Sequence, residues 1–142
     1  RKVIVEAGVV NAREIECAVL GNDDPETSVP GEIVPGREFY DYEAKYAPGG
    51  SEHVLPAQIP PDVYQAIQKL TVEAHHALGC RGVTRADFRY DDTRGVSGLA
   101  CLEVNTIPGM TETSLVLELA AYSGISFEEL VRWMIEDASC PR

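Results

Sequence analysis

Alternation of apolar and polar residues near the start of the chain predicts strands. In residues 13–21, Ile15, Cys17 and Val19 share one face and Glu14 and Glu16 share the other, because successive side chains of a strand point to opposite faces. Residues 3–6 and 31–35 are short apolar runs beside turn-forming residues, and we expect them to be strands as well. The longest of these strands is therefore apolar on one face and acidic on the other.

Helical periodicity follows further along the chain. Residues 62–78 carry apolar side chains at helical spacing, with Asp62 placed to cap the helix and Gly79 to end it. Another helix is expected from about Ser114, and a final helix begins at Ser126, where the sequence Ser-Phe-Glu-Glu matches a capping box.

Two strands between these helices form a predicted hairpin. Residues 82–90 and 98–105 have the composition of strands, and the turn at 91–95 joins them. Strands followed by a helix, a hairpin and further helices indicate an α+β fold, with a largely antiparallel sheet and packed helices. The length is that of one ordinary domain.

Residues 36–61 differ from the rest of the chain. They contain Tyr40, Tyr42 and Tyr46 and have little apolar periodicity. A connection this long inside a compact domain is usually a functional lid or a disordered linker, and its aromatic residues favour a lid.

Composition and charge narrow the range of functions. The 142 residues are 44% hydrophobic and 25% charged, with a net charge of −11. A folded domain has this composition, but nucleic acids and anionic membranes require a basic surface, so neither is expected as a partner. No apolar run approaches the roughly 20 residues that cross a bilayer. The four cysteines are far apart, and we expect structural thiols, with Cys17 and Cys101 buried, in a reducing compartment.

The first residues suggest that the chain is a piece of a longer protein. Arg1 is not an initiator methionine, and an apolar run that resembles a strand follows it directly. Part of an active site would then lie outside this sequence.

The hairpin brings together the residues best suited to chemistry. Alternation places Arg85 and Asp87 on one face of the first strand, and Glu103 and Asn105 on one face of the second. If the strands pair in register, two carboxylates, an amide and a guanidinium meet. Such oxygen ligands suit Mg²⁺ or Mn²⁺, and an arginine beside them can neutralise phosphoryl oxygens. The alternative is a solvated polar face that binds nothing.

Four residues outside the hairpin are weaker candidates. Gly109 permits close backbone approach, and Ser114 stands at a helix N-terminus that favours an anion, although a plain turn and helix cap explain both. Lys45 in the lid could reach a phosphate, and Glu14 could accept a ribose hydroxyl. Each of these two charges could equally be solvated.

Four segments, taken in order, resemble a known family. They are Arg13-Glu-Ile-Glu16, Phe39-Tyr-Asp-Tyr-Glu-Ala-Lys-Tyr46, Arg85-Ala-Asp-Phe88 and Glu103-Val-Asn-Thr-Ile-Pro-Gly-Met-Thr111. Together they resemble the D-alanine–D-alanine ligase family of the ATP-grasp superfamily. The resemblance covers essentially the whole chain and implies the C-terminal ATP-grasp portion, with residues 36–61 as its omega-loop lid. The family's N-terminal half, which carries the first D-alanine site and two ATP-binding lysines, is absent.

The resemblance implies a metal and nucleotide site. A pair of Mg²⁺ ions, or Mn²⁺, would be held by Asp87, Glu103 and Asn105. ATP would be contacted from adenine through ribose to phosphate by a set of residues along the chain: Glu6, Gly8, Val9, Phe39, Leu102, Glu14 and Lys45.

The resemblance also implies residues that act on the substrates. Arg85 and the backbone N–H of Gly109 would stabilise the oxyanion of the tetrahedral intermediate. Ser114 would meet the carboxylate of the second D-alanine. Tyr46 would close over the site.

The implied reaction joins two D-alanines to D-alanyl-D-alanine for peptidoglycan precursor synthesis in the cytoplasm. The first carboxylate attacks the γ-phosphate of ATP to give an acylphosphate, and the second amine displaces phosphate. Lys45-Tyr46 indicates dipeptide formation rather than D-lactate transfer and leaves D-serine open as a second substrate. The full-length enzyme would be a homodimer, and this fragment would be inactive alone. The alternative is a non-catalytic ATP-grasp piece that binds Mg²⁺ and nucleotide.

Overall fold

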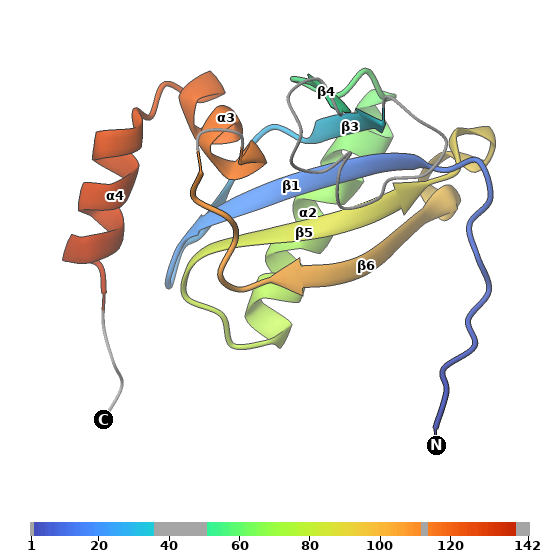
Figure 1. Ribbon diagram of the computed structural model, residues 1–142, viewed down its shortest axis with the longest axis horizontal. Coiled ribbons are helices and arrows are strands. Elements are labelled where there is room, and N and C mark those ends of the chain that lie inside the picture. The colour runs from blue at the N-terminus through green and yellow to red at the C-terminus, as the bar shows by residue number, and fades with distance from the viewer. Residues whose placement is uncertain (1, 36–50, 112–113, 139–142) are drawn as a thin grey trace.

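The computed structural model describes residues 2–35, 51–111 and 114–138 (Figure 1). The strands within these ranges are β1 (Arg13–Gly21), β2 (Glu26–Thr27), β3 (Gly31–Pro35), β4 (Ser51–Val54), β5 (Gly82–Tyr90) and β6 (Leu99–Asn105). The helices are α2 (Pro61–Ala77), α3 (Leu115–Tyr122) and α4 (Phe127–Glu136), and a 3₁₀ segment, η1 (Asp92–Gly98), joins β5 to β6.

The strands form one antiparallel sheet. Their order is β4-β3-β1-β5-β6, with the short β2 paired to β1 off this path. Helix α2 crosses behind β1, β5 and β6, whereas α3 and α4 lie toward the left-hand end of these strands (Figure 1). The predicted α+β architecture with an antiparallel sheet is therefore confirmed.

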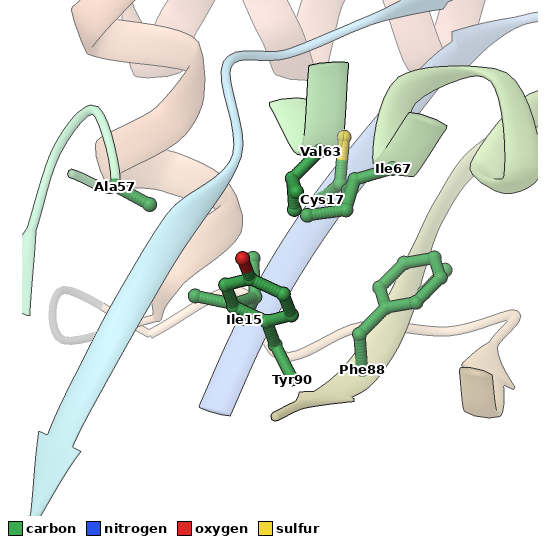
Figure 2. Packing of buried hydrophobic residues seen from close by; sticks show 8 residues of the cluster. Ile15, Cys17, Ala57, Val63, Ile67, Phe88 and Tyr90 are labelled. Atoms are coloured by element: carbon green, nitrogen blue, oxygen red, sulfur yellow. The ribbon is translucent and has the colours of Figure 1, made fainter. Parts of the chain in front are cut away.

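The main core lies between α2 and one face of the sheet. Ile15 and Cys17 of β1 and Phe88 of β5 pack against Val63 and Ile67 of α2, and all five are at most 1% exposed (Figure 2). Burial raises the pKa of the Cys17 thiol to about 11, as expected of a structural cysteine. The alternation predicted for residues 13–21 thus places Ile15 and Cys17 in this core.

The buried face of helix α2 contains polar as well as apolar side chains. Its fully buried positions continue from Ile67 to Thr71 and His75, where the His75 ring nitrogen Nδ1 lies 2.8 Å from the Thr84 hydroxyl. Asp62 is not the cap: Pro60 holds that position and has no side-chain acceptor, while Pro61, the first helical residue, has the fixed φ that a helix start requires. Gly79, at φ 63°, ends the helix as predicted.

A second core joins α3 and α4 to the opposite face of the sheet, near the C-terminal end of β1. Ala18, Val83 and Leu119 belong to this cluster and are 7% exposed or less. Helix α4 begins with the predicted capping box, in which Ser126 Oγ accepts from the backbone N–H of Glu129 and the Glu129 carboxylate accepts from Ser126 N–H. These helices cover only one end of that face.

The hairpin contains a β-bulge. Tyr90 pairs with Leu99 and Phe88 with Cys101, but Asp87 pairs with Glu103, so Leu102 is an extra residue in β6. A regular ladder continued from the tip would place Leu102 opposite Asp87. The bulge therefore brings the acidic residue, instead of the leucine, opposite Asp87.

Several expectations about local structure are wrong. Residues 3–6 are not a strand: Val3, Ile4 and Val5 are at least 85% exposed, and this segment pairs with none of the described strands. Residues 51–54, within the expected lid, form a strand that the sequence pattern did not predict, β4, which pairs with β3. The connection between β5 and β6 runs through η1 to residue 98 and is longer than the expected turn.

The cysteines and helices bear on two further expectations. Cys101 is exposed, whereas burial was expected, because it lies in the strand at the edge of the sheet. Among the described residues, Cys17, Cys80 and Cys101 are free thiols. No helix within the described ranges is long and apolar enough to cross a membrane.

Candidate functional site

Charged and polar side chains occupy the face of the sheet opposite α2. Asp87 pairs with Glu103 and Arg85 with Asn105 across the hairpin, and Glu16 of β1 pairs with Asp87 from the other side. Directly opposite residues in an antiparallel pair point to the same face. These five residues are called the polar face below, and the predicted convergence of the four hairpin side chains is observed.

Arg85 joins two carboxylates of the polar face. Its Nε and Nη2 donate to the two carboxylate oxygens of Asp87, both at 2.8 Å. Its Nε also lies 2.7 Å from Oε2 of Glu16. The side chains of Arg85, Glu16 and Asp87 are only 15%, 10% and 18% exposed, so these ion pairs are less screened than surface pairs.

The protonation of Arg85 is secured by its neighbours. Burial lowers the pKa of its guanidinium. The hydrogen bond to Asp87 and the charges of Glu16, Asp87 and Glu103 together raise this pKa by more than burial lowers it. The net pKa lies above the ordinary value for arginine, so Arg85 supplies a permanent positive charge to this face.

Asn105 links the two carboxylates of the hairpin. Its Nδ2 donates to Asp87 at 3.0 Å and to Glu103 at 3.4 Å, so both carboxylates are within reach of a single atom. Two carboxylates, with an amide that presents its oxygen after a half-turn, form the hard donor set that Mg²⁺ and Mn²⁺ accept. No group of three or more His, Cys, Asp or Glu side chains in the described segments is arranged to hold a metal. A cation here would complete its shell with water or phosphate oxygens.

Glu14 lies two residues before Glu16 on β1 and is held by an arginine. It pairs with Arg89 of β5, whose Nη1 lies 2.8 Å from the Glu14 carboxylate. Arg89 also donates to the carbonyl of Ala12 at 3.4 Å. The Glu14 side chain is 20% exposed, so its carboxylate is oriented and remains accessible.

Gly109 and Ser114 lie together at the start of α3. A Cβ atom on residue 109 would come within 2.9 Å of the Ser114 hydroxyl oxygen, so only glycine fits without movement. That oxygen accepts from the backbone N–H of Thr111 at 2.9 Å and makes no cap to its own helix. Gly109 and Thr111 thereby lie close to the Ser114 hydroxyl.

The remaining candidates lie in three different parts of the chain. Leu102, at the bulge, is 60% exposed. Glu6, Gly8 and Val9 are not brought to the polar face, because their segment leaves the end of β1 and runs away from the sheet (Figure 1). Phe39, Lys45 and Tyr46 lie outside the described residues.

Sequence reasoning assigned no role to Glu16 or Arg89, although each contacts a candidate. Alternation placed Glu16 on the acidic face of its strand, but the register with β5, which brings it to Arg85, is fixed only by tertiary pairing. Arg89 follows Asp87 by two residues and therefore shares its face, which is the signal that could have identified it.

Comparison with known proteins gives consistent results. The family described as "D-ala D-ala ligase C-terminus" matches residues 1–136. The chain is 61% identical to the D-alanine--D-alanine ligase of Rhodopseudomonas palustris (strain BisA53), over 99% of the chain and 45% of that ligase.

Solved structures agree with this match. The VanG D-Ala:D-Ser ligase from Enterococcus faecalis has a TM-score of 0.71 at 35% identity, covering 89% of this chain and 36% of the other. The Bacillus anthracis D-alanine--D-alanine ligase complexed with ATP has a TM-score of 0.70 at 27% identity, covering 90% and 40%.

The extent of these matches defines what they establish. The chain spans less than half the length of the Rhodopseudomonas palustris ligase, but the family match includes nearly every residue of the chain. The chain belongs to the D-ala D-ala ligase C-terminus family.

Proposed function

We propose that the chain is the C-terminal ATP-grasp portion of a D-alanine–D-alanine ligase, with residues 36–61 as its omega-loop lid. The complete enzyme would use ATP to join two D-alanines for cytoplasmic peptidoglycan precursor synthesis, releasing ADP and phosphate, and would act as a homodimer. The convergence of Asp87 and Glu103 beside Arg85, in a chain that matches the family over residues 1–136, is the observation that carries this proposal.

The phosphate end of the nucleotide is assigned to the polar face. Asp87, Glu103 and Asn105 would hold two divalent cations, Mg²⁺ or Mn²⁺. Bound there, such ions supply positive charge that neutralises phosphoryl oxygens. Arg85 adds a guanidinium whose planar N–H groups can bind two oxygens of a phosphoryl or acyl group at once.

The adenosine end is assigned to residues beside the polar face. Glu14, which Arg89 holds in place, would accept the ribose hydroxyls. Leu102 presents an exposed apolar surface on which a purine can pack. We propose further contacts to adenine from Phe39, Glu6, Gly8 and Val9. Lys45 is proposed to contact phosphate.

The acyl-transfer step is assigned to the loop before α3. The backbone N–H of Gly109 and the Arg85 guanidinium would stabilise the oxyanion as the second amine attacks the acylphosphate carbonyl. Ser114 would bind the carboxylate of the second D-alanine, and its neighbouring hydroxyl on Thr111, 2.9 Å away, would orient it. Tyr46 would close over these groups and exclude water, which would otherwise hydrolyse the acylphosphate.

The test uses a complete ligase in which this chain replaces the matching portion of the Rhodopseudomonas palustris enzyme. We expect phosphate release and dipeptide formation with ATP, Mg²⁺ and D-alanine, and a loss of both of at least about 100-fold in a Glu103→Gln variant. Glu73→Gln, on the exposed side of α2, is the matched control and should retain parental rates. Phosphate release by Glu103→Gln at the parental rate would refute the metal assignment.

The same assay addresses the second substrate and the alternative function. D-Serine replaces D-alanine in a parallel reaction, and the mixed dipeptide is detected by mass spectrometry. A hybrid that binds ATP and Mg²⁺ but makes no dipeptide would favour a non-catalytic nucleotide-binding piece.

A further inference from the structure

Arg85 has two carboxylate partners that belong to different strands. Asp87 lies on its own strand, β5, and engages both Nε and Nη2, while Glu16 reaches the same Nε from β1. The Glu16 contact, at 2.7 Å, is as short as the contacts to Asp87. The single Nε–H is donated to Asp87, so Glu16 contributes an ion pair and is placed to accept this N–H when Asp87 turns away.

Asp87 cannot serve Arg85 and a metal fully at the same time. Both of its oxygens accept from Arg85, and one of them also accepts from Asn105. A cation bound by Asp87 competes with these contacts for the carboxylate lone pairs and repels the guanidinium directly, so it weakens the Arg85–Asp87 pair. Glu16 stands on the side of Asp87 away from Glu103, since β5 lies between β1 and β6.

We propose that Glu16 is a positioning residue, which retains Arg85 on the polar face when Asp87 turns from Arg85 to a divalent cation. The inference rests on the proposed function, because it takes Asp87 as a metal ligand. Without Glu16, metal binding by Asp87 would leave Arg85 with no described carboxylate partner at short range. The Arg85 side chain is only 15% exposed, so water cannot fully replace that partner, and a buried charge without a partner is strongly unfavourable. With Glu16, the charge of Arg85 is balanced both before and after the exchange.

The first experiment measures Mn²⁺ binding to the 142-residue chain by the loss of the free-ion electron paramagnetic resonance signal. We expect Asp87→Asn to abolish the site and Glu16→Gln to weaken it about tenfold, since a partly buried charge loses its partner on metal binding. Glu32→Gln is the matched control: it removes from β3 a partly buried carboxylate that pairs with a different arginine, Arg13. It should weaken binding no more than about twofold, as a screened charge at longer range does.

A double-mutant cycle separates action through Arg85 from simple loss of charge. In an Arg85→Met background, Glu16→Gln should change Mn²⁺ affinity by no more than about twofold, because the residue that Glu16 positions is gone. An equal effect in both backgrounds would overturn the proposal.

Nuclear magnetic resonance supplies a readout that a merely structural role would not alter. On adding saturating diamagnetic Mg²⁺, the Nε–H resonance of Arg85 should remain protected from solvent exchange in the parent and become exchange-broadened in Glu16→Gln. Glu16→Asp, which keeps a carboxylate on a shorter side chain, should give intermediate protection and serves if Glu16→Gln unfolds.

The outcomes distinguish this inference from the proposed function. If the parent shows no Mn²⁺ binding that depends on Asp87, both the metal assignment and the role of Glu16 are overturned. If Asp87→Asn abolishes binding while Glu16→Gln and Glu32→Gln behave alike, only the role of Glu16 is overturned.

Discussion

Gly98 closes the connection between β5 and β6, and its replacement by alanine is the most informative test of the hairpin. A Cβ atom at this position would lie 2.1 Å from the carbonyl oxygen of Asp91 and 3.2 Å from Cβ of Arg94. The Asp91 contact is with backbone, so rotation of a side chain cannot relieve it. The same two residues are joined by a hydrogen bond from Asp91 N–H to the Gly98 carbonyl, at 3.0 Å.

The magnitude follows from these contacts. Restoring an ordinary carbon–oxygen separation of about 3.3 Å requires a backbone shift of roughly 1 Å. Overpacking of this kind costs about 2 kcal/mol, and loss of the Asp91–Gly98 hydrogen bond adds about 1 kcal/mol. We therefore expect Gly98→Ala to lower the free energy of unfolding by about 3 kcal/mol and Tm by about 10 °C.

Urea unfolding followed by far-ultraviolet circular dichroism measures this change. The control is Gly8→Ala, where an added Cβ meets no atom within 4 Å and stability should change by less than about 0.5 kcal/mol. A Gly98→Ala variant within about 1 kcal/mol of the parent would refute this reasoning, because the backbone at Asp91 would then move away from the added Cβ at little cost.

Two further predictions concern the helices. Burial lowers the pKa of His75 below its ordinary value of 6.5. As pH falls below 6.5, the unfolded chain takes up a proton at this residue while the folded chain resists it, so stability is lost on acidification. Urea titrations at several pH values should show a smaller loss of stability in His75→Gln than in the parent, and an equal loss would refute the assignment. Ser126→Ala removes the hydroxyl that accepts from Glu129 N–H in the capping box of α4 and leaves the backbone half of the box in place; it should destabilise the chain by about 1 kcal/mol, whereas an unchanged midpoint in thermal melts would mean that α4 does not unfold with the rest.

The hairpin was predictable from sequence because its information is local. Alternation alone assigns Arg85 and Asp87 to one face, and the same rule assigns Glu103 and Asn105 to one face. The bulge at Leu102 was not predictable, since it depends on how β6 is packed rather than on its own pattern. The four side chains were nevertheless assigned correctly, because they all lie on the same side of the bulge.

The errors have tertiary causes. Residues 3–6 have the composition of a strand, but pairing requires a neighbour, and none of the described strands adjoins them. Helix α2 buries Thr71 and His75 because the Ile67 carbonyl and the Thr84 hydroxyl provide hydrogen-bond partners that hydrophobic periodicity does not represent. Glu16 could be placed on a face by its strand but could not be connected to Arg85 without the register.

The bulge divides the hairpin into a charged inner part and an outer part that leads to η1. Both parts are anchored, because Val104 packs on the core on the inner side and Phe88 and Tyr90, at most 1% exposed, belong to the core on the outer side. Gly98, which closes the outer part, has no room for a Cβ atom. Val96, 44% exposed within η1, is accordingly the position where a tag or a spectroscopic probe can be attached beyond the bulge from the acidic residues.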